Sequence, residues 1–191
     1  MSAHKDTRRF VLAAIFSAII VVFTLIPNTG YISSGPVEIT TLHIPVILGA
    51  VFLGWKYGAM LGGVWGITCM LRAFTNPLWI MFTNPLISVL PRILVGIVAG
   101  LLFAVLKKTK MNIRVSSGIA AAGATITNTI LVLTAIYIFG DMIQSYADFF
   151  AMFKTIFVTI ITLNGLIELG AAILLVPLLC KALERFEPKE S

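Results

Sequence analysis

The sequence has very little charge: Asp, Glu, Lys and Arg make up only 12% of its 191 residues, against about 25% in an ordinary soluble domain. Hydrophobic residues make up 59%, and the mean hydropathy is +1.01. A globule of this size has too much surface for its volume to hide that much apolar area from water. The composition excludes a soluble enzyme, a secreted disulfide scaffold and a disordered tail. It predicts one integral-membrane domain over residues 1–191.

Residues that usually carry catalysis or bind metals are also scarce. The two cysteines, Cys69 and Cys180, lie in separate apolar stretches, which indicates buried thiols and neither a disulfide nor a zinc site. The sequence has no Walker loop, no Gly-x-Ser-x-Gly and no His-Glu-x-x-His. We therefore expect no enzymatic activity, metal or cofactor in this chain. The net charge of +6 is interpreted as a topology signal, with no nucleic-acid partner.

Apolar stretches separated by polar or proline-containing segments predict an all-α membrane protein with six transmembrane helices. The second and third helices are expected to be short and joined by a tight turn at residues 54–58, because one long helix would carry Lys56 through the middle of the bilayer. The expected spans are Phe10–Ile26, Ile44–Leu53, Ala59–Leu71, Pro85–Leu106, Val115–Phe139 and Thr155–Leu179.

The distribution of Lys and Arg supports this register and predicts that both termini are cytoplasmic, because basic residues gather in cytoplasmic loops. Only Arg72 and Lys154 fall on the opposite side, and Arg92 falls inside a span. The basic residues on the side of the termini are Lys5, Arg8, Arg9, Lys56, Lys107, Lys108, Lys110, Arg114, Lys181, Arg185 and Lys189.

A few polar side chains interrupt the predicted spans, and such groups in a membrane indicate function. Arg92 lies about two turns into the fourth span. Asn128 lies near the middle of the fifth span, and Asn164 and Glu168 share one face of the sixth at i, i+4 spacing. We expect them to line a cavity open to the outside. Alternatively, they tie the helices together, with Arg92 paired to Glu168.

The two long outer loops, residues 27–41 and 72–84, add further candidates for substrate binding. Irregular backbone at membrane depth is tolerated where it lines a cavity, so these loops are candidate lids. Aromatic residues there are also typical of an interfacial belt, and His43 also suits a helix cap or a packing position. The loop candidates are Thr41, His43, Arg72, Trp79 and Asn84.

The sequence resembles the substrate-binding S-components of energy-coupling factor (ECF) vitamin transporters. The resemblance is carried by the stretch from Ile39 to Ala50, by Leu53-Gly54-Trp55-Lys56-Tyr57-Gly58-Ala59, and by Phe82-Thr83-Asn84-Pro85-Leu86-Ile87-Ser88-Val89-Leu90-Pro91-Arg92. It implies a prokaryotic plasma-membrane protein with six helices that binds a vitamin from the outside. It also implies a membrane coupling subunit (the T component) and two ABC ATPases as partners, with ATP and Mg on those partners.

Within that family, the motifs are most similar to pantothenate-type members. Arg92 would then suit the carboxylate, with Arg72 as a rival, and Asn128 and Asn164 would suit an amide or hydroxyls. Folate, for which Trp65, Phe74 and Trp79 would supply a flat slot, and a pyridoxine-like compound remain alternatives. So do an autonomous secondary transporter and a structural membrane protein.

The first predicted span carries the small-residue spacing Ala14-x-x-x-Ala18, which allows a second helix to approach closely. This spacing fits a contact within the chain as well as a partner. The resemblance implies that this face docks onto the coupling subunit.

Overall fold

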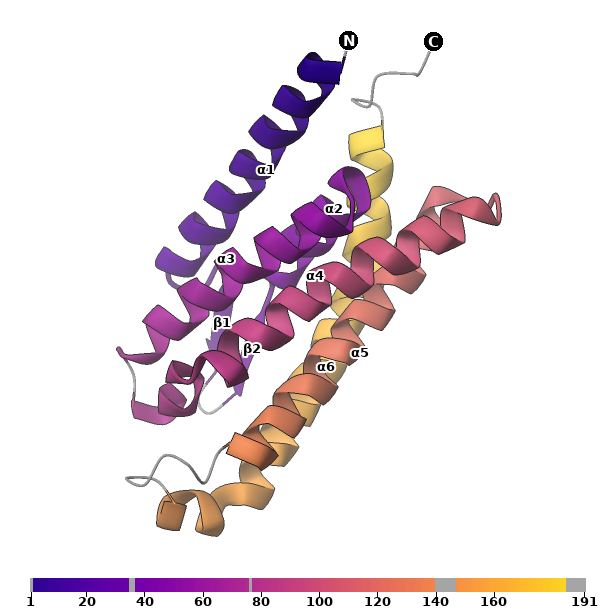
Figure 1. Cartoon of the computed structure of the whole chain (residues 1–191). Helices are drawn as coiled ribbons and strands as arrows, with labels where there is room; N and C mark the ends of the chain where they lie inside the picture. Colours follow the sequence, from indigo (N-terminus) through magenta and orange to yellow (C-terminus); the bar gives the residue numbers. More distant parts are fainter. Residues whose placement is uncertain (1, 35–36, 76, 140–146, 185–191) are drawn as a thin grey trace.

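A computed structural model gives the protein as a bundle of long helices with a small β-hairpin packed against its side (Figure 1). It describes residues 2–34, 37–75, 77–139 and 147–184. Within these residues the elements are α1 (Ser2–Leu25), β1 (Tyr31–Ser34), β2 (Val37–Thr40), α2 (His43–Leu53), α3 (Trp55–Ala73), the 3-10 helix η1 (Pro77–Thr83), α4 (Pro85–Lys108), α5 (Ile113–Phe139) and α6 (Ala147–Glu184).

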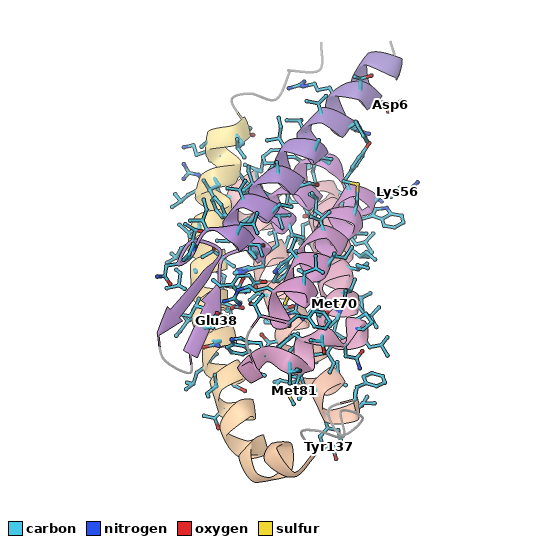
Figure 2. All side chains as sticks on the ribbon, turned by 90° about the vertical axis from the view of Figure 1, so that its left-hand side faces the viewer. Asp6, Glu38, Lys56, Met70, Met81 and Tyr137 are labelled. Atoms are coloured by element: carbon cyan, nitrogen blue, oxygen red, sulfur yellow. The ribbon has the colours of Figure 1, made fainter. Side chains whose placement is uncertain are left out.

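The start of α1 and the end of α6 lie at the same end of the bundle, which we call the terminal end; the hairpin and η1 lie toward the opposite, hairpin end (Figure 1). Lys56 lies at the terminal end with Asp6, whereas Glu38 and Met81 lie toward the hairpin end (Figure 2). The basic residues of the last turns of α4 and α6 also belong to the terminal end. This matches the predicted charge distribution; Arg185 and Lys189 lie outside the described residues.

In the part of the chain that the structure describes, four helices are long and apolar enough to cross a bilayer. Their apolar segments are Asp6–Leu25, Pro85–Lys108, Ile113–Phe139 and Thr159–Glu184. The apolar α2 is shorter, with 11 residues. The all-α membrane fold is therefore confirmed in its coarse form, whereas six complete spans stay a prediction.

Helix α2 forms the centre of the bundle. Every residue of α2 except Phe52 is buried, as expected of a helix that is apolar on all sides. It reverses directly into α3 through Gly54, whose φ of 95° lies in the left-handed region that favours glycine. The predicted tight turn thus consists of one residue, and Lys56 lies in the first turn of α3, at the bundle end and not at mid-depth.

Helices α3 and α4 pack with their backbones in direct contact. A Cβ on Gly58 would overlap the carbonyl of Gly96, and a Cβ on Gly62 would overlap the carbonyl of Arg92. A Cβ on Gly66 would lie 2.6 Å from the Cα of Val89. Small residues at every fourth position permit such an approach in a membrane, where close van der Waals packing drives helix association.

Several boundaries differ from the sequence prediction. Helix α1 begins at Ser2, eight residues before Phe10, because the charged N-terminal segment continues the helix beyond its apolar part. Helix α6 begins at Ala147, eight residues before the predicted start of the sixth span at Thr155. The first outer loop contains the β-hairpin, in which Tyr31 is opposite Thr40. The hairpin was not predicted, since its strands have only four residues each.

The glycine contacts between α3 and α4 predict a position-specific loss of stability. Gly62→Ala should lower the free energy of unfolding by about 1–3 kcal/mol, because its methyl group has no room against the backbone of α4. Gly170→Ala on α6 is the matched control, since a Cβ there meets nothing within 4 Å. Thermal unfolding of the purified variants in detergent measures the difference. Equal midpoints for the two variants would contradict the packing.

Candidate functional site

A cavity lies beneath the hairpin, with a volume of about 80 Å³ available to the centres of water molecules. Its walls come from both strands, from η1 and from α3, α5 and α6. The lining side chains are mixed polar and aromatic: Tyr31, Glu38, Thr40, Cys69, Arg72, Ala73, Trp79, Phe82, Asn128, Thr129, Val132, Ile161, Asn164, Gly165 and Glu168.

Strand β2 is fixed to α6 along the edge that β1 does not cover. The Asn164 amide donates from Nδ2 to the carbonyl of Glu38 (2.9 Å), and the Thr40 N–H donates to Oε1 of Glu168 (2.7 Å). The spacings match, because four helical residues rise about 6 Å and two strand residues rise about 6.8 Å. Asn164 and Glu168, which the sequence placed on one helix face, therefore satisfy backbone groups at the free edge of β2. Part of their hydrogen bonding stabilises the fold.

A second attachment joins β2 to the end of α3. Arg72 forms a bidentate ion pair with Glu38, with N···O distances of 2.6 and 2.8 Å. Its guanidinium also stacks 4.2 Å from the ring centre of Tyr31 on β1. Burial raises the pKa of the Tyr31 phenol above its ordinary value, so the ring stays neutral beneath the cation. Because Glu38 already neutralises Arg72, this arginine is a poorer partner for a ligand carboxylate.

The two asparagines each present an oxygen with no hydrogen-bond partner among the described residues. Asn128 and Asn164 are buried, at 7% and 8% exposure, and their Oδ1 atoms are unpaired. Both side chains line the cavity. A buried polar atom without a partner costs free energy, so these oxygens indicate where a donor group of a ligand is accepted.

Arg92 lies behind the cavity wall. Its Nη1 donates to the carbonyl of Ile87 (2.7 Å), which Pro91 leaves without its usual helical donor because proline has no N–H. Its Nη2 is 3.9 Å from the Cys69 sulfur. Within the described residues no carboxylate pairs with Arg92, and Glu168 instead accepts from Thr40. The alternative in which Arg92 and Glu168 form an ion pair is therefore not the observed arrangement.

Three other candidates are structural in position. Asn84 caps α4 by accepting from the N–H of Leu86 (2.9 Å). The Thr41 hydroxyl donates to the carbonyl of Thr29 (2.9 Å). His43 begins α2 and is only 1% exposed. None of the three lines the cavity, whereas Trp79, Glu168 and both asparagines do.

Sequence reasoning missed several lining residues, chiefly Tyr31, Thr40, Cys69, Phe82 and Thr129. Cys69 was predicted only as a buried thiol, and it is buried at 8% exposure, but its position in the cavity wall was not expected. The signal that was available is the density of polar residues in the first outer loop. If Glu38-Ile39-Thr40 is taken as a strand, the side chains of Glu38 and Thr40 point to the same face.

Ala14 and Ala18 lie on the exposed side of α1, whereas Ala13 and Ile20 of the same helix are fully buried. The small-residue face therefore points away from the chain's own bundle. The contact within the chain is made by another face of α1, which carries Ala13 and Ile20.

Comparisons with known proteins agree with these features. The family model "ECF transporter, substrate-specific component" matches residues 8–180. The chain is 34% identical over 194 residues to the pantothenic acid transporter PanT of Lactococcus lactis subsp. cremoris, covering 90% of this chain and 93% of the relative. It is 37% identical over 108 residues to the pantothenate transporter PanT of Leuconostoc mesenteroides subsp. mesenteroides, covering 53% of each.

The ion pair between Glu38 and Arg72 should hold the hairpin against α3. Arg72→Met should increase hydrogen exchange of the hairpin amides, because the Glu38 carboxylate loses its cation. The exchanged pair Glu38→Arg with Arg72→Glu should restore part of the protection. Mass spectrometry of hydrogen exchange measures both variants. Unchanged protection in Arg72→Met would mean that the bonds to α6 hold the hairpin alone.

Proposed function

Because the chain belongs to the family of substrate-specific components of ECF transporters, we propose that it binds pantothenate from the outside for uptake driven by partner subunits. It is a multi-pass cell-membrane protein. The observation that carries the proposal is the set of unsatisfied groups at one cavity. Within the described residues, the Oδ1 atoms of Asn128 and Asn164 accept no hydrogen bond, and Arg92, behind the cavity wall, forms no ion pair with a carboxylate.

Pantothenate has the complementary groups. Its carboxylate suits the guanidinium of Arg92, since arginine binds carboxylates through two parallel hydrogen bonds. Its amide N–H and two hydroxyls are donors for the Oδ1 atoms of Asn128 and Asn164. Val132 and Ile161 offer an apolar wall for its two methyl groups.

A larger, flat ligand such as folate is less well matched. Of the three aromatic side chains considered for it, Trp79 lines the cavity. Trp65 is fully buried within the helices and Phe74 is 68% exposed. These positions support the smaller vitamin over an aromatic slot.

The partners follow from the family. In this proposal all six helices cross the membrane, both termini are cytoplasmic, and Ala14 and Ala18 dock onto a membrane coupling subunit. Two ABC ATPases carry ATP and Mg on that complex, whereas this chain uses no cofactor and catalyses no reaction. Binding of tritiated pantothenate by the purified chain, without the ATPases, tests the binding role. If vesicles that contain only this chain took up pantothenate, the proposed dependence on partner subunits would be wrong, and the chain would be an autonomous transporter.

The charge of Arg92 should dominate pantothenate binding. Arg92→Ala should weaken binding by about 2–5 kcal/mol, because the ligand carboxylate would enter the cavity without a cation. Equilibrium dialysis with tritiated pantothenate measures the change. Arg114→Ala is the matched control, since Arg114 is exposed at the terminal end. Equal affinity of the two variants would remove Arg92 from the site.

The exposed face of α1 should matter for transport and not for binding. Ala14→Trp should leave the affinity for pantothenate unchanged but abolish ATP-driven uptake, because the indole prevents close approach of a partner helix. Leu174→Trp is the control, since Leu174 is 68% exposed on α6. Uptake assays in vesicles containing the complete transporter compare the two. Normal uptake by Ala14→Trp would refute the docking role.

A further inference from the structure

The surroundings of Arg92 are unusual for a cation buried in a membrane bundle. The residue is 6% exposed, and a buried charge is costly unless it is compensated. Within the described residues, its polar contacts are the Ile87 carbonyl and the Cys69 thiol. Neither contact carries a full negative charge, and the Glu168 carboxylate acts on Arg92 electrostatically without forming an ion pair, so further compensation must come from other groups.

Two aromatic rings provide it. The guanidinium carbon lies 5.3 Å from the ring centre of Trp65 on α3 and 5.3 Å from that of Phe82 on η1. A cation within about 6 Å of a ring centre is attracted by the negative face of the ring, and more strongly when water is absent. The rings stabilise the charge without occupying its hydrogen-bond donors.

The donors that remain are those that a carboxylate needs. Nη1 is used by Ile87, whereas Nε has no partner and Nη2 has only the thiol at 3.9 Å. Nε and Nη2 form one edge of the planar fork, which binds the two oxygens of a carboxylate side by side. Cys69 and Phe82 both contact Arg92 and line the cavity. We therefore expect a carboxylate in the cavity to meet this edge between Cys69 and Phe82.

Trp65 differs from Phe82 because it does not line the cavity and is fully buried. The glycines on either side of it, Gly62 and Gly66, bring the backbone of α4 against α3. This close approach places the indole beside Arg92. Neither Trp65 nor Arg92 lines the cavity, and the Trp65 ring faces the guanidinium, so we expect Trp65 to influence binding through Arg92.

We propose that Trp65 is a positioning residue for ligand binding: its ring holds the Arg92 guanidinium so that the Nε–Nη2 edge stays available to the carboxylate of the ligand. This inference rests on the proposed binding of pantothenate. It assigns to Trp65 a role in recognising the negative charge of the ligand, and no role in recognising its amide or hydroxyls.

The test compares two ligands on one set of variants. Trp65→Leu should raise the Kd for pantothenate by about 5- to 30-fold. It should change the Kd for the alcohol analogue, in which CH₂OH replaces the carboxylate, by less than about twofold, since no charge is then recognised. Trp65→Phe, which keeps an aromatic face, should recover most of the affinity. Trp55→Leu is the control, because Trp55 is 43% exposed and stacks on Lys56. Titration calorimetry of the purified chain gives each Kd.

A double-mutant cycle adds a readout that does not depend on the analogue. On an Arg92→Ala background, Trp65→Leu should cause no further loss of pantothenate affinity, because the residue acts through the guanidinium. Equal losses for both ligands, or additive losses in the cycle, would mean that Trp65 only supports the fold and would overturn the inference. If the unaltered chain fails to bind pantothenate, the proposed function itself fails, which is a different result.

Discussion

Every polar group buried in an apolar bundle needs a hydrogen-bond partner or another source of compensation, and this requirement organises the site. The bonds from Asn164 and to Glu168 satisfy the outer edge of β2. The carbonyl that Pro91 leaves unpaired is satisfied by Arg92. Among the described residues, the cavity keeps unpaired oxygens of Tyr31, Asn128 and Asn164. The binding chemistry is therefore defined by the groups that the fold does not use itself.

The site lies between two parts of the molecule that are held in different ways: the helix pair α3 and α4, and the β-hairpin. Helices α3 and α4 are in backbone contact through their glycines, so Trp65 and Arg92 keep a fixed relation. The hairpin is attached through Glu38 and Thr40, which bond to side chains of α3 and α6. The anchoring charge thus lies on the rigid part, and the cover over the cavity rests on a few polar contacts.

The sequence was sufficient for the helices and for the polar residues of α5 and α6, because apolar length and rare intramembrane polar groups are local signals. The sequence was insufficient to tell which of Arg72 and Arg92 pairs with a carboxylate of the chain and which is left for a ligand. The sequence prediction placed both arginines toward the outer side, and only the structure brings Glu38 to Arg72, 34 residues away in the sequence. The assignment of Asn84, Thr41 and His43 to the site had no local signal that separates a cap or tie from a ligand contact. Long-range pairing decides such roles.

The small volume of the cavity has a mechanical consequence. Ordinary ligand pockets enclose about 300–1,000 Å³, whereas this one offers about 80 Å³. We therefore expect a vitamin to widen the cavity as it binds. The glycine contacts hold α3 against α4, so we expect the movement in the other walls, which are the hairpin, η1, α5 and α6. The affinity for the ligand then includes the free-energy cost of moving the hairpin, and that cost depends on the contacts that hold it, such as the ion pair between Glu38 and Arg72.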